Sequence, residues 1–213
     1  MLPPPRTRPR LRGVLHQYAF FASLFAGTLL VAIAPSPRAR TAALVYGASL
    51  SALLGVSTLF HRVTWTTPGA RRWMGRLDHT MIAVLIAGTF TPFAMLALPD
   101  HLGPTLLLVV WIGAAVGTLL HVLWADIPKW LSALSYVVLG WVGVVATPTL
   151  LAAGWTIPIL LLIGGLLYSL GAAVYALRRP DPVPAVFGYH EVFHALVVVA
   201  AGVHWAAVVL AVA

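Results

Sequence analysis

Seven apolar segments, each close to the length of a membrane-spanning helix, constrain this chain more than any other feature. A helix needs about 20 mostly apolar residues to cross a bilayer. Segments of this kind lie at roughly 14–34, 41–61, 78–98, 104–124, 130–151, 156–177 and 188–211. Only 8% of the 213 residues are charged, against about 25% in a soluble domain. The sequence therefore predicts an all-α membrane protein, with one seven-transmembrane-helix bundle over residues 1–213.

The uneven distribution of basic residues sets the predicted orientation of this bundle. If the N-terminus is cytoplasmic, eleven of the thirteen Lys and Arg residues lie in inner segments, beginning with the basic tail 1–12. Only Arg38 and Arg40 lie outside. Cytoplasmic loops of membrane proteins carry such an excess. We therefore expect a cytoplasmic N-terminus and an outer C-terminus, and we interpret the net charge of +8 as a topology signal rather than a nucleic-acid-binding surface.

Four polar residues from three spans are predicted at one depth, just inside the cytoplasmic face. Span two ends at His61, and span three begins near Asp78. Span seven begins near His190 and His194, which are four residues apart and therefore lie on one face of a helix. Helices present two imidazoles to one metal ion at this spacing. Because the chain has no cysteine, a metal here would need nitrogen and oxygen ligands.

Each of these residues also has a simpler structural interpretation. His61 could complement the dipole at the C-terminus of its helix, and Asp78 could cap the start of span three. The pair His190 and His194 could join neighbouring helices by hydrogen bonds. One shared site explains four residues at one depth better than four separate roles do.

The remaining histidines are expected to have other roles. His16 lies near the start of span one without a predicted partner, and His79 points to another face than its neighbours in the site. His204 lies about 15 Å farther along the last helix than the histidine pair, where a packing or interfacial role is expected. His121, near the inner end of span four, is the one spare candidate ligand.

Three segments, taken in order, resemble the progestin and adipoQ receptor family, in particular its bacterial hemolysin III branch. The segments are Ser57-Thr58-Leu59-Phe60-His61, then Leu77-Asp78-His79 with Gly88-Thr89-Phe90-Thr91-Pro92-Phe93, and finally His190-Glu191-Val192-Phe193-His194. The interval of 17 positions from His61 to Asp78 fits the family pattern. The resemblance covers about residues 12–211. It implies an alkaline-ceramidase-like hydrolase fold in a bacterial plasma membrane, with the site open toward the cytoplasm.

The resemblance also implies a role for each matching residue. His61, His190 and His194 correspond to three zinc ligands. Asp78 corresponds to the acid beside the water of the metal site, and Ser57 to the family's site serine. Three imidazoles leave the fourth position of tetrahedral zinc to water, as in catalytic zinc sites. We therefore expect a zinc-dependent hydrolase of a lipid amide or ester, which acts on a membrane lipid or another amphipathic substrate in membrane lipid homeostasis.

Two other functions fit parts of the sequence. A structural zinc could hold spans two and seven together in a non-catalytic, receptor-like or membrane-perturbing (hemolysin) protein. The segment from His190 to His194 also reads as HExxH, in which Glu191 would be the general base of an intramembrane metalloprotease and Asp78 a further ligand. An open water position favours the enzyme, whereas a closed four-ligand site favours structural zinc.

Overall fold

Seven helical spans form a single bundle, which confirms the predicted fold. The computed structural model describes residues 8–124 and 127–213, and within these ranges seven spans are long and apolar enough to cross a membrane. They are α1 (Val14–Ile33), α2 (Pro37–Arg62), α3 (Pro68–Leu96), α4 (Gly103–Leu123), the fifth span, α7 (Thr156–Leu177) and α8 (Tyr189–Val212). The fifth span consists of α5 (Lys129–Trp141), the 3₁₀ helix η1 (Val142–Ala146) and α6 (Thr147–Ala153).

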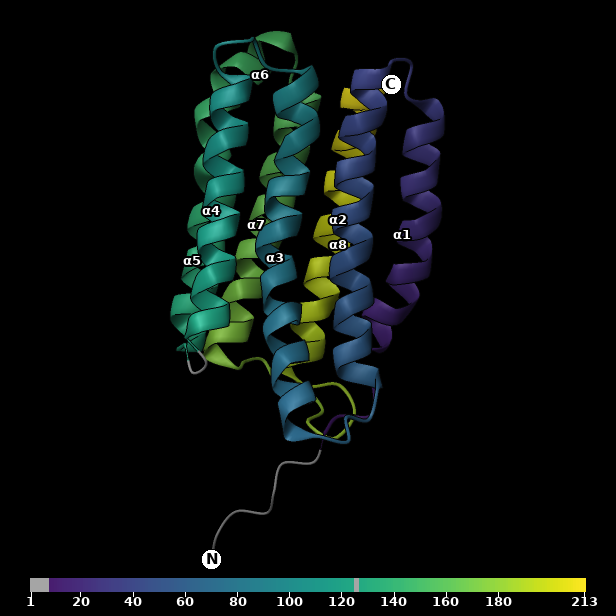
Figure 1. Ribbon diagram of the computed structural model, residues 1–213, viewed down its shortest axis with the longest axis vertical. Helices are drawn as coiled ribbons and strands as arrows, with labels where there is room; N and C mark the ends of the chain where they lie inside the picture. The colour runs from purple at the N-terminus through teal and green to yellow at the C-terminus, as the bar shows by residue number, and fades with distance from the viewer. Residues whose placement is uncertain (1–7, 125–126) are drawn as a thin grey trace, which may run out of the picture.

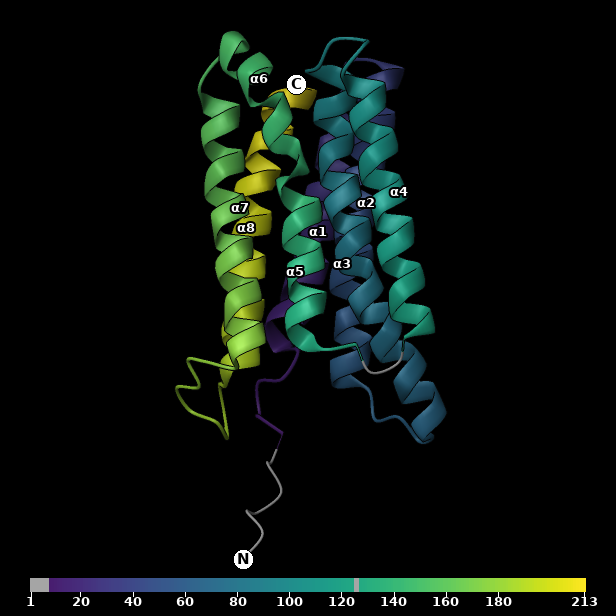
Figure 2. The same ribbon diagram turned by 90° about the vertical axis from the view of Figure 1, so that its left-hand side faces the viewer.

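The last helix, α8, lies inside the bundle and contacts α1, α2, α3 and α7. Figure 1 shows α8 behind α2 and α3. In Figure 2, α5 lies between α7 and α3 and contacts both. One buried apolar core joins residues of α1, α2, α3 and α8, and a second joins α3, α4 and the fifth span. This packing places side by side the three helices that carry the predicted site residues.

The helices α2 and α3 begin earlier than their apolar segments, because capping sequences precede them. The Ser36 side chain accepts a hydrogen bond from Ala39 N (3.1 Å), and Pro37 occupies the first turn. Thr67 caps α3 in the same way. These are the residue types that helix starts prefer. Asp78 therefore lies ten residues inside α3 rather than at its start, and the interpretation of Asp78 as a helix cap is wrong.

The two ends of the bundle differ in charge. Arg38 and Arg40 lie at the start of α2, at one end. The opposite end carries Arg8, Arg10, Arg12, Arg62, Arg71, Arg72, Arg76, Lys129, Arg178 and Arg179. Arg6, which the sequence places with them, is outside the described residues. The start of α1 and the end of α8 lie at opposite ends of the bundle (Figure 1). Which end faces the cytoplasm stays a prediction.

Candidate metal centre

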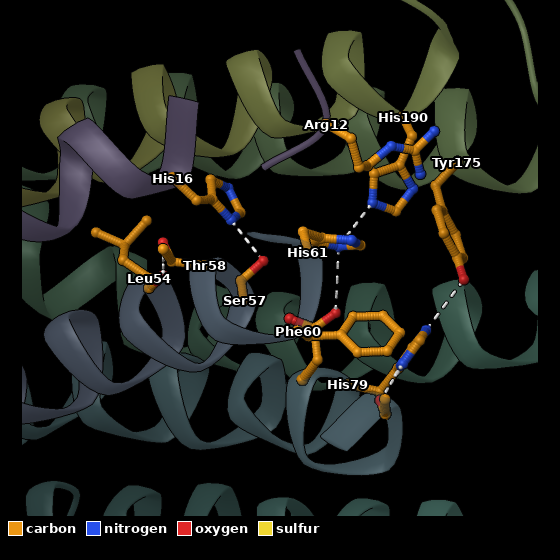
Figure 3. A network of polar contacts seen from close by, with 12 residues as sticks. Arg12, His16, Leu54, Ser57, Thr58, Phe60, His61, His79, Tyr175 and His190 are labelled. Carbon is orange, nitrogen blue, oxygen red and sulfur yellow. Dashed lines mark hydrogen bonds and ion pairs between the residues drawn. The ribbon is translucent and has the colours of Figure 1, made fainter. Parts of the chain in front are cut away.

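Three histidines from two helices form a compact cluster at the basic end of the bundle. His61 lies in the last turn of α2, and His190 and His194 lie in the first two turns of α8. One ring nitrogen of each lies within 4.8 Å of the other two. The Nε2 atoms of His61 and His190 are 3.2 Å apart (Figure 3). The structure therefore brings together the three residues that were predicted as metal ligands.

The chemistry of this histidine cluster suits a metal ion. His61 and His194 are only 6% and 2% exposed. Protonating both rings at such positions would bury two like charges, which is costly. Each ring brings one nitrogen that can act as a ligand, these nitrogens lie within 4.8 Å of one another, and Zn²⁺ is bound by neutral imidazole nitrogens. The residues present thus fit a zinc ion, with no cysteine needed.

Asp78 reaches the cluster from α3. Its Oδ2 atom lies 3.7 Å from His61 Nε2, and its side chain is 14% exposed. Asp78 also lines the cavity that His190 and His194 line. A carboxylate at this place is close enough to exchange a proton with a small molecule held beside the histidines. The predicted acid therefore lies in the site, although it comes from inside a helix.

Ser57 lies one turn before His61 and has a partner that the sequence did not predict. Its Oγ atom is 2.8 Å from His16 Nδ1 (Figure 3). The His16 ring also lies flat on the ring of His194, with centroids 3.7 Å apart and planes inclined by 2°. The expectation that His16 has no partner is wrong, because the first turn of α1 packs against α2 and α8. The one signal for His16 in the sequence was its place near the start of span one, at the predicted depth of the histidine cluster.

Glu191, the general base of the HExxH alternative, is held by backbone and ion-pair contacts. It is 1% exposed, and its Oε2 atom accepts a hydrogen bond from Gly188 N (2.9 Å). Its Oε1 atom forms an ion pair with Arg12 at 2.6 Å. A carboxylate in the first turn of a helix is also favoured by the helix dipole. Both oxygens are therefore engaged in fixing the start of α8 and the N-terminal segment.

The N-terminal segment 9–13 lies at the basic end of the bundle, directly beside the histidine cluster. The Leu11 N–H donates to the Val186 carbonyl (3.1 Å), which ties the segment to the α7–α8 loop. Gly13 has φ 79°, a conformation that glycine adopts at little cost. A Cβ atom at Gly13 would collide with Cβ of His61. Glycine thus allows the segment to pass directly against one of the candidate ligands.

A second polar group surrounds His79 and His121, and one of its members, Tyr175, also lies against the ring of His190, with centroids 5.9 Å apart. Each ring nitrogen of these two histidines has a hydrogen-bonding partner at 2.8–3.0 Å. The partners are the carbonyls of Gly75 and Gly117 and the hydroxyls of Tyr175, Ser132 and Tyr136. We call this group the His79–His121 network. It joins α3, α4, α5 and α7, so His121, the spare candidate, is used as a structural tie.

A cavity of about 150 Å³ extends from the histidine cluster between the helices. Near the cluster its polar lining includes His16, Ser57, Asp78, His79, His190 and His194. Other polar side chains also line it, namely Thr89, Tyr136, Tyr168, Ser169 and Tyr175. Farther along, apolar side chains line it, including Leu53, Ile82, Leu85, Phe90 and Val197. His204, which was expected to have a packing role, also lines the cavity, and its Nε2 lies 3.2 Å from the Leu161 carbonyl. The cavity suits a molecule with one polar end and an apolar chain.

Comparison with known proteins supports the resemblance seen in the three segments. The family description "Haemolysin-III related" matches residues 5–205. The hemolysin-3 homolog of Bacillus subtilis (strain 168) is 34% identical over 157 residues, which cover 72% of this chain and 68% of the relative. The hemolysin-3 of Bacillus cereus is 37% identical over 135 residues, which cover 62% of this chain and 59% of the relative.

A eukaryotic relative extends this likeness to the adipoQ receptors. The adiponectin receptor protein of Drosophila melanogaster is 30% identical over 182 residues. The alignment covers 71% of this chain but 38% of the receptor. The bundle, the ordered segments and these matches agree with one another, and the chain belongs to the haemolysin-III-related family.

Proposed function

We propose that this protein is a zinc-dependent hydrolase that cleaves an amide or ester bond of a membrane lipid. The observation that carries the proposal is a cluster of three imidazoles, two of which, His190 and His194, line a mostly apolar cavity together with the carboxylate of Asp78. A metal site alone would fit a structural role. A metal site that adjoins a cavity and a carboxylate fits a role in chemistry.

In this proposal, His61, His190 and His194 hold the zinc ion. A zinc ion held there would supply Lewis acidity toward a substrate carbonyl and would make water a stronger acid and so a better nucleophile near neutral pH. The three rings come from α2 and α8, so the site is assembled only when these helices are packed. Burial of His61 and His194 favours their neutral form, in which an imidazole can act as a ligand.

Asp78 is the proton acceptor in this proposal. Its carboxylate lies beside the histidine cluster and in the cavity wall, where it can take a proton from an attacking water and return it to the leaving group. Ser57 lies in the same wall and offers a hydroxyl to the polar part of the substrate. Glu191 is less suited to the acceptor role, because both of its oxygens already have partners.

The substrate class follows from the lining of the cavity. A polar bond placed at the histidine cluster would leave an acyl chain along Leu85, Phe90 and Val197. Helices that expose large apolar residues to the bilayer allow such a lipid to remain near the site. The excess of basic residues at this end of the bundle supports an orientation toward the cytoplasm in a bacterial plasma membrane.

The proposal can be tested with purified protein in lipid nanodiscs, incubated with a mixed lipid extract. We expect zinc-dependent release of fatty acid, measured by mass spectrometry. Asp78→Asn should bind zinc but release little fatty acid. Asp100→Asn is the matched control, since Asp100 lies in the loop before α4, at the other end of the bundle. A protein that binds zinc tightly but releases no product from any lipid class would favour the structural-zinc alternative.

A further inference from the structure

We propose that His16 is a positioning residue of the histidine cluster, which holds the ring of His194 in place and directs the hydroxyl of Ser57 into the cavity. The inference rests on the proposed metal site and adds a fourth histidine to it. Three observations carry it: a parallel ring contact, a short hydrogen bond, and the burial of an imidazole nitrogen that has no partner within the described residues.

The ring contact restrains a candidate ligand. His16 and His194 are 3% and 2% exposed, and their rings are parallel to within 2° at a centroid distance of 3.7 Å. Metal-binding histidines usually have their ring orientation fixed by a hydrogen bond from the second ring nitrogen. Among the described residues, the ring of His194 forms no such bond, and its contacts are with other rings. The flat contact with His16 is therefore the restraint that keeps the His194 ring from tilting toward α1.

The hydrogen bond gives the Ser57 hydroxyl a direction. His16 Nδ1 is 2.8 Å from Ser57 Oγ, whereas the buried Nε2 of His16 has no hydrogen-bonding partner in the described part of the chain. Buried N–H groups are rarely left unpaired. We therefore assign the ring proton to Nδ1, which donates it to Ser57 Oγ. The serine proton is then free to be donated into the cavity, whose wall Ser57 shares with Asp78.

Two substitutions separate these contributions. His16→Phe keeps a flat ring against His194 but removes the donor to Ser57. His16→Asn places an amide near the position of Nδ1 and can keep the bond to Ser57, but it removes the ring. His16→Ala removes both contacts. Ser23→Ala is the control, because Ser23 is buried on the same helix and also joins α1 to α2, through Ser51 (2.9 Å), but lies two turns farther along.

The test measures metal binding directly, with Zn²⁺ in competition with a chromophoric chelator and with the visible absorption of Co²⁺ in its place. Loss of a residue that orients a metal ligand typically weakens metal binding about 10–100-fold. We expect a loss of this size in His16→Ala and His16→Asn, with a changed Co²⁺ spectrum. His16→Phe should stay close to the wild-type affinity and spectrum. In a lipid-release assay, His16→Phe should lose activity despite its bound zinc, because Ser57 is no longer held.

The outcomes distinguish this inference from the proposed function. If the wild-type protein and Ser23→Ala bind zinc, and folded His16→Ala binds it with the same affinity and the same Co²⁺ spectrum, the positioning role is refuted while the zinc site stands. If the wild-type protein binds zinc but cleaves no lipid, the proposed hydrolase fails, and the Zn²⁺ and Co²⁺ measurements still decide the role of His16. A wild-type protein that binds neither ion would refute both.

Discussion

Two groups of histidines lie within this bundle, and they use their ring nitrogens in opposite ways. In the His79–His121 network, all four ring nitrogens have hydrogen-bonding partners. In the histidine cluster of His61, His190 and His194, the six ring nitrogens form one hydrogen bond within the described residues, between two members of the cluster. Both groups combine fully buried and half-buried histidines that lie close together. Candidate metal ligands are therefore distinguished by ring nitrogens that lie close together and have no hydrogen-bonding partner outside the cluster, whereas the ring nitrogens of structural histidines bond to neighbouring helices.

The largest effect should come from removing one ligand. His61→Ala leaves two imidazoles, which rarely suffice to hold zinc in place. Loss of a residue that only orients a metal ligand weakens metal binding by up to about 100-fold, and the zinc affinity of His61→Ala should fall by more than that. His121→Ala removes an equally buried histidine and should leave zinc affinity unchanged. Chelator competition on both purified variants checks this pair. Equal losses in the two variants would erase the distinction between the two groups.

The next effect concerns the carboxylate beside the cluster. Asp78→Asn keeps the size of the side chain but cannot accept a proton, so zinc should stay bound while lipid hydrolysis falls by about 10²–10⁴-fold. Initial rates of fatty acid release, with zinc content measured on the same samples, test this. If Glu191→Gln abolished hydrolysis and Asp78→Asn did not, the HExxH interpretation would replace ours.

Glu191→Gln should act on stability instead of chemistry. It breaks the ion pair with Arg12 and leaves a partly buried guanidinium without its partner. Loss of one member of a buried pair costs about 3–5 kcal/mol, and we expect the lower end because the Arg12 side chain is 19% exposed. Thermal unfolding in detergent should show the loss. An unchanged unfolding temperature would mean that the N-terminal segment is held by other contacts.

The smallest effect is expected in the His79–His121 network. Tyr136→Phe removes a hydroxyl that bonds to His121 Nε2 and to the His79 carbonyl (both 2.9 Å). A single hydrogen bond contributes about 1 kcal/mol to stability. We therefore expect a loss of that order in unfolding experiments, with zinc binding as in the wild-type protein. A strong loss of zinc would show that the network and the cluster are one functional unit.

The fold was predictable from sequence because the bilayer sets the length and polarity of each span. The residues at which each helix begins and ends were less predictable. The apolar pattern starts span three at Asp78, whereas α3 begins at Pro68, because the cap at Thr67 and the basic residues that follow extend the helix beyond its apolar part. Hydropathy detects the segment that lies in hydrocarbon, and the end of the helix depends on capping groups that hydropathy ignores.

The site was predictable where helix geometry sufficed. The spacing of His190 and His194 and the depth of His61 placed these residues together, and the structure agrees. The start of span one placed His16 at the same predicted depth as the cluster. Its contact with His194 and the pairing of Arg12 with Glu191 were not predictable, because both depend on how α1 and the segment before it pack against α8. Long-range packing of this kind leaves no periodic signal in the sequence.

The central claim, that the histidine cluster holds zinc, is tested most directly by X-ray absorption at the zinc edge on purified, zinc-loaded protein. We predict one zinc per chain with three imidazole nitrogens at about 2.0–2.1 Å and one oxygen ligand, such as water, in the remaining position. The same measurement on His194→Ala should show loss of the ion or of one imidazole. Wild-type protein without bound zinc, or a His194→Ala spectrum identical to that of the wild type, would contradict the claim.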